Sequence, residues 1–422
     1  MQNMIDGAIA TLKECTIIAD IAKSRLEEVK NLQLDIVGDE DREFRTYSKA
    51  EAQSWLGVKH ATKLSRAIKE LESSPKPVRF EREANGHYKF TIQDLHTLAD
   101  AMDIPKFKRK PNDKCQVICV SALKGGAAKT TTAVNVASGL AVNNNKRYRV
   151  AVIDLDPQGT GTMFGVPNLT DDDFTVGDIL QGNFDLDEGE SEKDFVKSCF
   201  KNTSIPNLDY LPARVSDFFF ESVAEQIKID EYDQPNSDKN RTYRLLKERI
   251  IDAVSDDYDI IILDTAPALN TTFYNAIYAS TSLLIPVIPE LVSLDATLKY
   301  LERLKDIYAI AAKAGHEGMD FIRMLVTNFD DSGNKTHITV HRTYKTDLQT
   351  IFSNRVLAYP LKHSAAIPIC ADNYMTVFEM NPKEYPKSRA KLLDCVSNLS
   401  EVVNEVEVLC CQAWPSIRTN MR

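Results

Sequence analysis

The chain has 422 residues, of which 43% are hydrophobic and 27% charged, and its formal net charge is −10. This composition is typical of a globular protein with two or three domains, and no apolar run approaches the ~18 residues that a transmembrane helix needs. The acidic balance excludes bulk attraction to nucleic acid, the eight cysteines lack metal-ligand spacing, and the first residues lack a secretory signal, so we expect a cytoplasmic protein.

Residues 1–36 are predicted to form one long amphipathic helix. Apolar residues recur at steps of three to five from Ile5 through Ile21 to Leu32, with lysine and glutamate over much of the other face. Nothing nearby in the sequence can cover the apolar face, which favours a dimerisation helix. Packing of this helix against its own chain is the alternative.

Residues 37–105 are predicted to form a winged helix-turn-helix domain that binds DNA. Residues 46–110 carry thirteen Lys or Arg against eight Asp or Glu. Ser48 and Glu51 match a capping box, and Gly57 stands at a turn before the next helix. A recognition helix in the major groove would present a cluster of basic side chains. These are Lys59, His60, Lys63 and Arg66.

The wing is predicted from two β-prone runs, residues 78–83 and 87–92, on either side of an Asn85-Gly86 turn. A basic, proline-bounded linker over residues 106–114 follows this domain. The alternative is a small solvated helical domain whose charges only keep it soluble.

A phosphate-binding loop is predicted at residues 121–132, between a β-prone run at 116–120 and a helical pattern that extends to Leu140. Strand, glycine-rich loop and helix N-terminus together direct backbone N–H groups at phosphate oxygens. Lys129 matches the lysine that reaches the β and γ phosphates, and Thr130 the hydroxyl that ligates Mg²⁺. Ala128 stands where glycine is usual, and alanine resists positive φ.

Two further apolar strands end in acidic residues. The run at 148–153 ends in Asp154-Leu155-Asp156, and the run at 257–263 ends in Asp264. Continuous apolar runs indicate parallel strands covered on both faces, and ligands bind at the carboxyl ends of such strands. Asp264 therefore suits the Mg²⁺ shell, and Asp156 suits a group that orients the attacking water. We expect an α/β fold with a mostly parallel, doubly wound sheet, the P-loop NTPase class.

The loop Lys-Gly-Gly-x-x-Lys-Thr-Thr, Asp-x-Asp-Pro-Gln-Gly and Asp-Thr-Ala-Pro resemble the ParA branch of the deviant Walker-A ATPases. Ile-Pro-Val-x-Pro-Glu at 285–290 is similar to a further family strand, and the resemblance covers about residues 115–395. It implies a ParA-like P-loop ATPase domain over 115–422 that hydrolyses ATP to ADP with Mg²⁺. It also implies that Lys124 is the signature lysine, which crosses an ATP-sandwich homodimer to the partner's nucleotide.

The expected catalytic residues are Lys124, Lys129 and Asp156, and the expected Mg²⁺ site is Thr130, Asp156 and Asp264. The expected nucleotide site combines the loop with two residues that the resemblance assigns to base contacts. It comprises Lys124, Gly125, Gly126, Ala127, Ala128, Lys129, Thr130, Thr131, Pro289 and Asn328.

The resemblance further implies a partition ATPase of a plasmid or chromosome, associated with the nucleoid and stimulated by a ParB-like partner. Long members of this group dimerise through the N-terminal helix and repress their own operon through operator DNA. C-terminal basic residues of the family bind nonspecific DNA; here these are Lys383, Lys387, Arg389 and Lys391. Lys335, Arg342 and Lys345 are a second candidate patch.

Two alternatives remain open. A membrane-associated positioning ATPase similar to MinD would need a basic amphipathic C-terminal helix, whereas residues 392–409 carry four acidic side chains. A repressor in which nucleotide only gates operator binding would use the same N-terminal domain. We expect no membrane partner.

Overall fold

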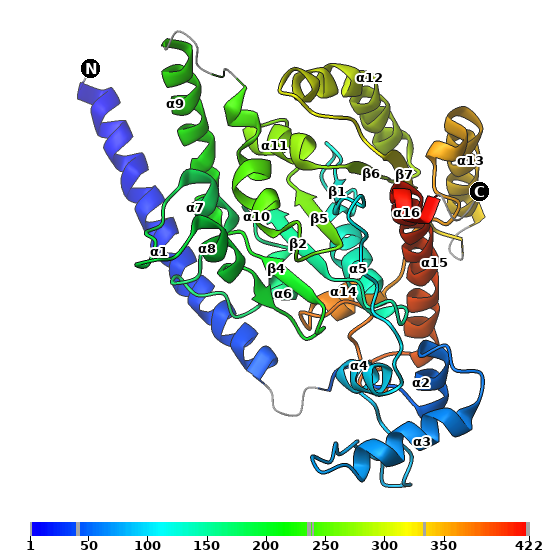
Figure 1. Ribbon diagram of the computed structural model, residues 1–422. Helices are drawn as coiled ribbons and strands as arrows, with labels where there is room; N and C mark the ends of the chain where they lie inside the picture. Colours follow the sequence, from blue (N-terminus) through cyan, green and yellow to red (C-terminus); the bar gives the residue numbers. More distant parts are fainter. Residues whose placement is uncertain (1, 39–42, 234–237, 239, 332–334, 419–422) are drawn as a thin grey trace. The chain divides into compact units, whose positions relative to one another are not determined.

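The computed structural model describes the chain except residues 1, 39–42, 234–237, 239, 332–334 and 419–422 (Figure 1). The chain divides into two compact units, Met1–Glu43 and Phe44–Arg422. Within the described residues, no helix combines the length and the apolarity that crossing a membrane requires.

The first unit is dominated by α1 (Gln2–Gly38), a single helix of 37 residues. The predicted N-terminal helix is therefore confirmed. Large apolar side chains along it are exposed: Leu12, Ile17, Ile18, Ile21, Leu26, Val29, Leu32, Leu34 and Ile36. An apolar face of this extent suits a contact with another surface, so dimerisation through α1 stays a prediction.

The second unit is built on a seven-stranded sheet of order β3-β4-β2-β5-β1-β6-β7. All neighbouring strands are parallel except β3, which is antiparallel to β4. This confirms the predicted mostly parallel sheet. The strands are β1 (Gln116–Val120), β2 (Val150–Leu155), β3 (Lys201–Asn202), β4 (Leu208–Leu211), β5 (Ile260–Thr265), β6 (Ser282–Val287) and β7 (Phe321–Val326).

Helices cover both faces of the sheet because successive strand residues point to opposite sides. Ile118 and Val120 of β1 pack into one core with α5 and α15, while Val117 and Cys119 pack into the other with α11 and α12. The first face is covered by α5 (Lys129–Val142), α14 (Ala366–Ala371) and α15 (Arg389–Ala413). The second is covered by α7 (Val176–Gln181), α8 (Glu192–Ser198), α9 (Phe220–Asp233), η3 (Leu246–Ile251), α10 (Asp252–Val254), α11 (Thr271–Ala279) and α12 (Leu291–Lys313).

Shorter elements and one edge helix complete the unit. They are α6 (Thr162–Gly165), η1 (Val215–Phe219), η2 (Arg241–Tyr243), α13 (Lys335–Phe352), η4 (Ser353–Arg355) and α16 (Pro415–Arg418).

Residues 47–104 form a small helical region with its own core, centred on Leu64, Ile68, Phe90 and Leu95. Its helices are α2 (Lys49–Trp55), α3 (Ala61–Glu72) and α4 (Ile92–Ala101). The capping box of Ser48 and Glu51 is present, and Gly57 adopts φ +67 in the turn between α2 and α3.

The hairpin in this region is shorter than expected. The two predicted strands of six residues share only one isolated bridge, Arg82 to Tyr88. Phe90 forms a bridge with Tyr47 instead, and Ile92 already belongs to α4. In the tight turn, the Glu83 N–H donates a hydrogen bond to the His87 carbonyl. A winged helix-turn-helix therefore stays a prediction.

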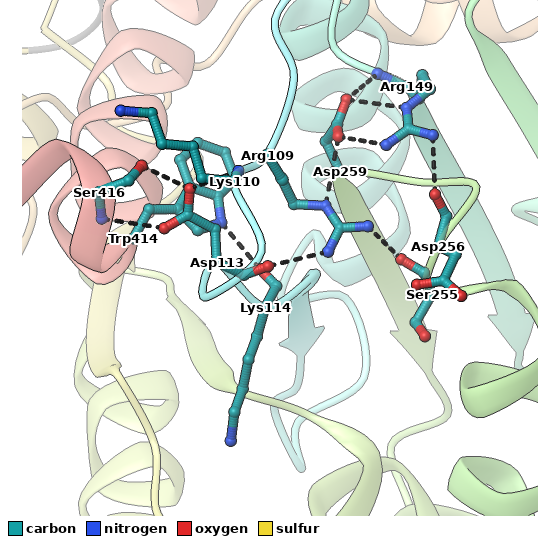
Figure 2. A network of polar contacts seen from close by, with 10 residues as sticks. All are labelled: Arg109, Lys110, Asp113, Lys114, Arg149, Ser255, Asp256, Asp259, Trp414 and Ser416. Atoms are coloured by element: carbon teal, nitrogen blue, oxygen red, sulfur yellow. Dashed lines mark hydrogen bonds and ion pairs between the residues drawn. The ribbon is translucent and has the colours of Figure 1, made fainter.

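The segment predicted as a linker, residues 106–114, packs against the amino-terminal ends of the strands, whereas the phosphate loop lies at their carboxyl ends (Figure 2). The Arg109 guanidinium contacts the fully buried Asp259 carboxylate at 3.4 Å and donates to the Ser255 carbonyl. Asp113 accepts hydrogen bonds from the Ser416 N–H and hydroxyl. Trp414 donates its indole N–H to the Lys114 carbonyl at 2.8 Å. This segment is therefore part of the packed body of the protein.

Candidate functional site

The phosphate loop lies between the end of β1 and the first turn of α5. Ala128 adopts φ +63 and ψ +34, and Gly126 adopts φ +75. A Cβ added to Gly125 or Gly126 would meet no atom within 4 Å, so the loop backbone borders open space. Ala128 holds the left-handed conformation at a cost of roughly 1–2 kcal/mol, which the surrounding contacts must offset.

Lys129 begins α5, and only 7% of its surface is exposed. Burial lowers the pKa of its ammonium, and the nearby carboxylates of Asp264 and Asp156 oppose that shift. In the part of the chain that the structure describes, Lys129 forms no ion pair with an acidic side chain. A buried cation at the start of a helix, beside an open loop, suits an anionic ligand such as phosphate.

Asp264 ends β5 and is fully buried. Within the described residues neither carboxylate oxygen accepts a well-formed hydrogen bond, although the Thr130 side chain lies near enough to favour the charged form. Burial and the negative charge of Asp154 raise the pKa of Asp264 well above its ordinary value, while Thr130 and Lys129 oppose the rise. Buried polar atoms without partners are rare, and this pair of oxygens suits a bound cation or its water shell.

The sequence reasoning gave no separate role to Asp154, which the structure places beside Asp264. A Cβ added to Gly161 would lie 3.0 Å from one oxygen of each carboxylate, so both face the same small space. Asp154 accepts hydrogen bonds from the Thr162 N–H at 2.7 Å and from the Asp156 N–H at 3.0 Å. Burial raises its pKa to about 6. Asp154 therefore holds the loop that carries Asp156, and its position in the Asp-x-Asp motif was the available signal.

Asp156 is half-buried in the loop after β2. One of its oxygens accepts the Gln158 N–H at 3.0 Å, and its carbonyl accepts the Gly159 N–H at 2.8 Å. Because β2 and β5 are parallel neighbours with Asp154 in register with Asp264, Asp156 lies just beyond the same sheet edge. The three acidic residues and Lys129 are thus brought together as one site.

Lys124 stands near the start of the phosphate loop and is half-buried. Its ammonium donates to the hydroxyl of Ser293, in the first turn of α12. Ser293 had no signal in the sequence, because the contact joins residues 169 positions apart.

The two residues expected near the base are placed around the loop. Pro289 is buried just before α12. Asn328 adopts φ +51 and shares a hydrogen bond with His363 at 2.7 Å. The preceding Thr327 donates its hydroxyl to the Ala127 carbonyl at 3.2 Å, which brings the end of β7 against the phosphate loop.

The residues expected to contact DNA lie outside this site, in two places. Lys59 and His60 precede α3, while Lys63 and Arg66 lie on it, and all four are exposed. The sequence predicts all four residues on the recognition helix, whereas α3 begins only at Ala61.

The C-terminal group lies at and before the start of α15. Lys387, Arg389 and Lys391 are exposed there. Lys383 forms an ion pair with Glu83 of the short hairpin, so one cation of this group is already paired within the chain.

Asp264→Asn is expected to raise the thermal stability of the nucleotide-free protein. Because burial raises its pKa, the native state binds the Asp264 proton more tightly than the unfolded chain, and the carboxylate costs stability once pH exceeds ~4. Removing the charge should recover about 1–3 kcal/mol, a few degrees in Tm. The gain should be larger at pH 7.5 than at pH 5, in calorimetry at both pH values.

Asp259→Asn is the matched control. Asp259 is equally buried but accepts hydrogen bonds from Arg149, so its loss should lower Tm. A fall in Tm for Asp264→Asn would contradict the description of Asp264 as an uncompensated buried charge.

Comparisons with known proteins agree with this geometry. A family model described as an AAA domain matches residues 115–314. Plasmid partition protein A from Escherichia coli is 25% identical over 378 residues, covering 86% of this chain and 89% of that protein. Protein SopA from Escherichia coli K12 is 28% identical over 317 residues, covering 72% and 75%. A solved structure described as a partition protein is 24% identical with a TM-score of 0.63, covering 93% of this chain and 98% of that one.

Proposed function

Because this chain belongs to the ParA family of partition ATPases, we propose that it is a Mg·ATP-dependent switch that segregates a plasmid or chromosome. It hydrolyses ATP slowly in the cytoplasm. Its ATP-bound homodimer binds nucleoid DNA without sequence preference, and a ParB-like partner stimulates hydrolysis and release. The observation that carries this proposal is the buried Lys129 beside the uncompensated carboxylate of Asp264, at the edge of an open phosphate loop.

The residues present fit a nucleotide and a magnesium ion. The loop from Lys124 to Thr131 supplies backbone N–H groups and the two lysines for phosphates. Thr130 and Asp264 would hold the ion, with Asp156 beside them, and the ion would neutralise phosphate charge. Lys129 holds its ammonium at the base of the loop, and Asp154 keeps the Asp156 loop in place.

The phosphate loop and its neighbours are the part of the proposal that bears on the rate of hydrolysis. Phosphoryl transfer needs mostly positioning and charge stabilisation, which Asp156 and Lys124 would supply. Ala128 adopts a left-handed conformation that alanine disfavours, so the loop holds a strained geometry. A slow ATPase suits a timed switch.

Two basic groups support the DNA-binding part of the proposal. Arg389 and Lys391 lie in the first turn of α15, where cations are unfavourable beside the positive end of the helix dipole. Bound phosphates would relieve this repulsion, and the four charges doubled in a dimer would make binding salt-sensitive. The exposed basic residues of α3 would serve operator DNA.

Lys124→Ala is expected to keep nucleotide binding at one site and to lose ATP-dependent DNA binding. The reason is that Lys124 would complete the site of the second copy, so its loss weakens the dimer rather than the loop. Binding to random-sequence duplex should be measured with ATP, ADP or neither, from 50 to 300 mM salt. The wild type should bind only with ATP and steeply with salt, and Lys124→Ala at least ~10-fold more weakly.

The outcomes separate the candidate functions. DNA binding that ignores both nucleotide and Lys124 would contradict the segregation switch and favour a repressor joined to an ATPase. ATP-dependent binding to anionic vesicles instead of DNA would favour a positioning ATPase. The acidic side chains of α15, among them Glu401, argue against that second result.

A further inference from the structure

A cleft of about 410 Å³ lies beside the first turn of α5. Small-molecule sites in proteins commonly enclose roughly 300–1,000 Å³, so this volume suits a compact ligand. Three segments form its walls: the start of α5 with Thr130 and Thr131, the loop and short helix that follow β2, and α14. The cleft is therefore next to the hydroxyl that would hold the magnesium ion.

Apolar side chains make most of the wall of this cleft. Met163 and Phe164 contribute from α6, and Ile367, Pro368 and Ala371 contribute from α14. Covering such a surface removes apolar area from water, which is favourable. The walls therefore suit a ligand with an apolar body.

Among the described residues, Asp372 is the one charged residue that lines the cleft. It comes directly after α14 and is exposed, and no hydrogen bond or ion pair joins its carboxylate to another described residue. A carboxylate at the C-terminal end of a helix is unfavourable, because that end of the helix dipole is negative. A bound cation would offset this repulsion, so the ligand that suits the cleft carries a positive charge.

A larger cleft, of about 1070 Å³, lies beside residues 109–114 at the amino-terminal ends of the strands. Its rim carries ion pairs within the chain, among them Lys114 with Glu317 and Lys247 with Asp252. Charges that already have partners give a ligand less to recognise. The smaller cleft, with the carboxylate of Asp372, therefore has the clearer ligand preference.

The backbone of the smaller cleft is strained at one point. Tyr374 lines it and adopts φ +53. A bulky side chain in the left-handed region is an outlier, and such residues gather at sites that clamp a ligand. The strain at Tyr374 is therefore a second observation, independent of the apolar walls, that indicates a ligand site.

The cleft is connected to the loop that carries Asp156. Thr160 and Met163 line the cleft and stand on either side of Thr162 in the sequence. Thr162 donates its N–H and its hydroxyl to the Asp154 carboxylate, at 2.7 and 2.9 Å. A ligand that packs against Met163 would therefore restrict the motion of the loop that begins at Asp156.

We propose that this cleft is a second ligand site, which takes a small apolar molecule with one positive charge and speeds ATP hydrolysis by holding the Asp156 loop in place. The regulation rests on the proposed function, which supplies the hydrolysis, whereas binding can be tested without nucleotide. Because a positioned group acts through its geometry, a restricted loop should raise kcat and leave the KM for ATP unchanged.

The experiment uses three probes that share a phenyl group and differ in charge. They are phenethylamine, which is protonated at neutral pH, phenethyl alcohol and phenylpropionate. Saturation-transfer NMR titrations measure their affinities for the full chain without nucleotide. The amine should bind about 5-fold more tightly than the carboxylate, the range for an exposed charge pair. Saturating amine should raise kcat at least about twofold and change the KM for ATP by less than about twofold.

Asp372→Asn should bring the affinities of the amine and the carboxylate to within about twofold of each other, because it removes only the charge. Asp394→Asn is the matched control. Asp394 has the same charge, is exposed on α15 and does not line the cleft, so its loss should preserve the preference for the amine. Ala371→Phe places a ring in the cleft and should abolish binding of all three probes. Ala371→Leu replaces it if the phenylalanine variant does not fold.

Two results would overturn the inference. One is binding of the three probes that is equal in the wild type and undiminished in the filled variant. The other is an amine that binds but leaves kcat unchanged or lowers it. A chain that hydrolyses no ATP would contradict the proposed function as well as the regulation, and the affinities of the variants would then decide the ligand site alone.

Discussion

Lys129→Ala should reduce ATP turnover to background and weaken nucleotide binding by at least ~100-fold, the scale seen when a charge-stabilising donor is lost from a reacting site. The side chain is buried between the phosphate loop and two carboxylates, Asp156 and Asp264. Without its ammonium, these acidic groups would face the phosphates of the nucleotide with no buried cation between them. Titration calorimetry with Mg·ATP and phosphate-release kinetics measure both effects.

Lys114→Ala is the control for Lys129. Lys114 lies just before β1, at the other end of the strand, and forms an exposed pair with Glu317. Its loss should leave binding and turnover within about twofold, because exposed pairs contribute little. Turnover by Lys129→Ala at the wild-type rate would show that the loop is not the nucleotide site. The Tm of Lys129→Ala without nucleotide should stay close to that of the wild type. This measurement separates a loss of nucleotide binding from a loss of folding.

Asp156→Ala should keep ATP affinity within a few-fold and lower hydrolysis by about 100-fold or more, the range for a positioned group in proton transfer or water orientation. Asp156 begins the loop that Asp154 holds, beyond the same sheet edge as Asp264. Slower hydrolysis prolongs the ATP-bound state. ATP-dependent dimers and their DNA complexes should therefore persist, as sedimentation and DNA release after dilution would record.

Asp156→Asn separates charge from loop geometry. The amide oxygen can still accept the Gln158 N–H that the carboxylate accepts at 3.0 Å. If the asparagine variant hydrolyses ATP as slowly as the alanine variant, the negative charge is what matters. If both retain wild-type hydrolysis, Asp156 is not the water-orienting group.

The local patterns of the sequence were sufficient for the sheet and the phosphate loop. The strand predicted at 116–120 is β1, and the runs ending at Asp154 and Asp264 are β2 and β5. Continuous apolar runs followed by acidic or glycine-rich turns are properties of a few neighbouring residues. They can therefore be recognised without knowing what packs against them.

What could not be predicted depends on contacts between distant residues. Nothing near Lys124 in the sequence points to Ser293, and nothing near Trp55 points to the Val142 carbonyl. Ala128 is expected to resist positive φ, yet it adopts φ +63 because tertiary context overrides the preference of one residue. The segment 106–114 has the composition of a linker, and only the fold shows that Arg109 meets Asp259.

The contacts of residues 106–114 limit how related proteins can exchange their N-terminal regions during evolution. Phe107 packs between Tyr148 and Trp414, with ring centroids 4.8 and 4.7 Å away. Cutting the chain after residue 114 would expose these rings and take one of two arginines from the buried Asp259. Recombination at residue 114 would therefore not exchange the helical region as an independent unit. A functional chimera would have to include residues 106–114 of the same parent. Otherwise it would need matching substitutions at the ends of the three strands that this segment contacts and at the C-terminus.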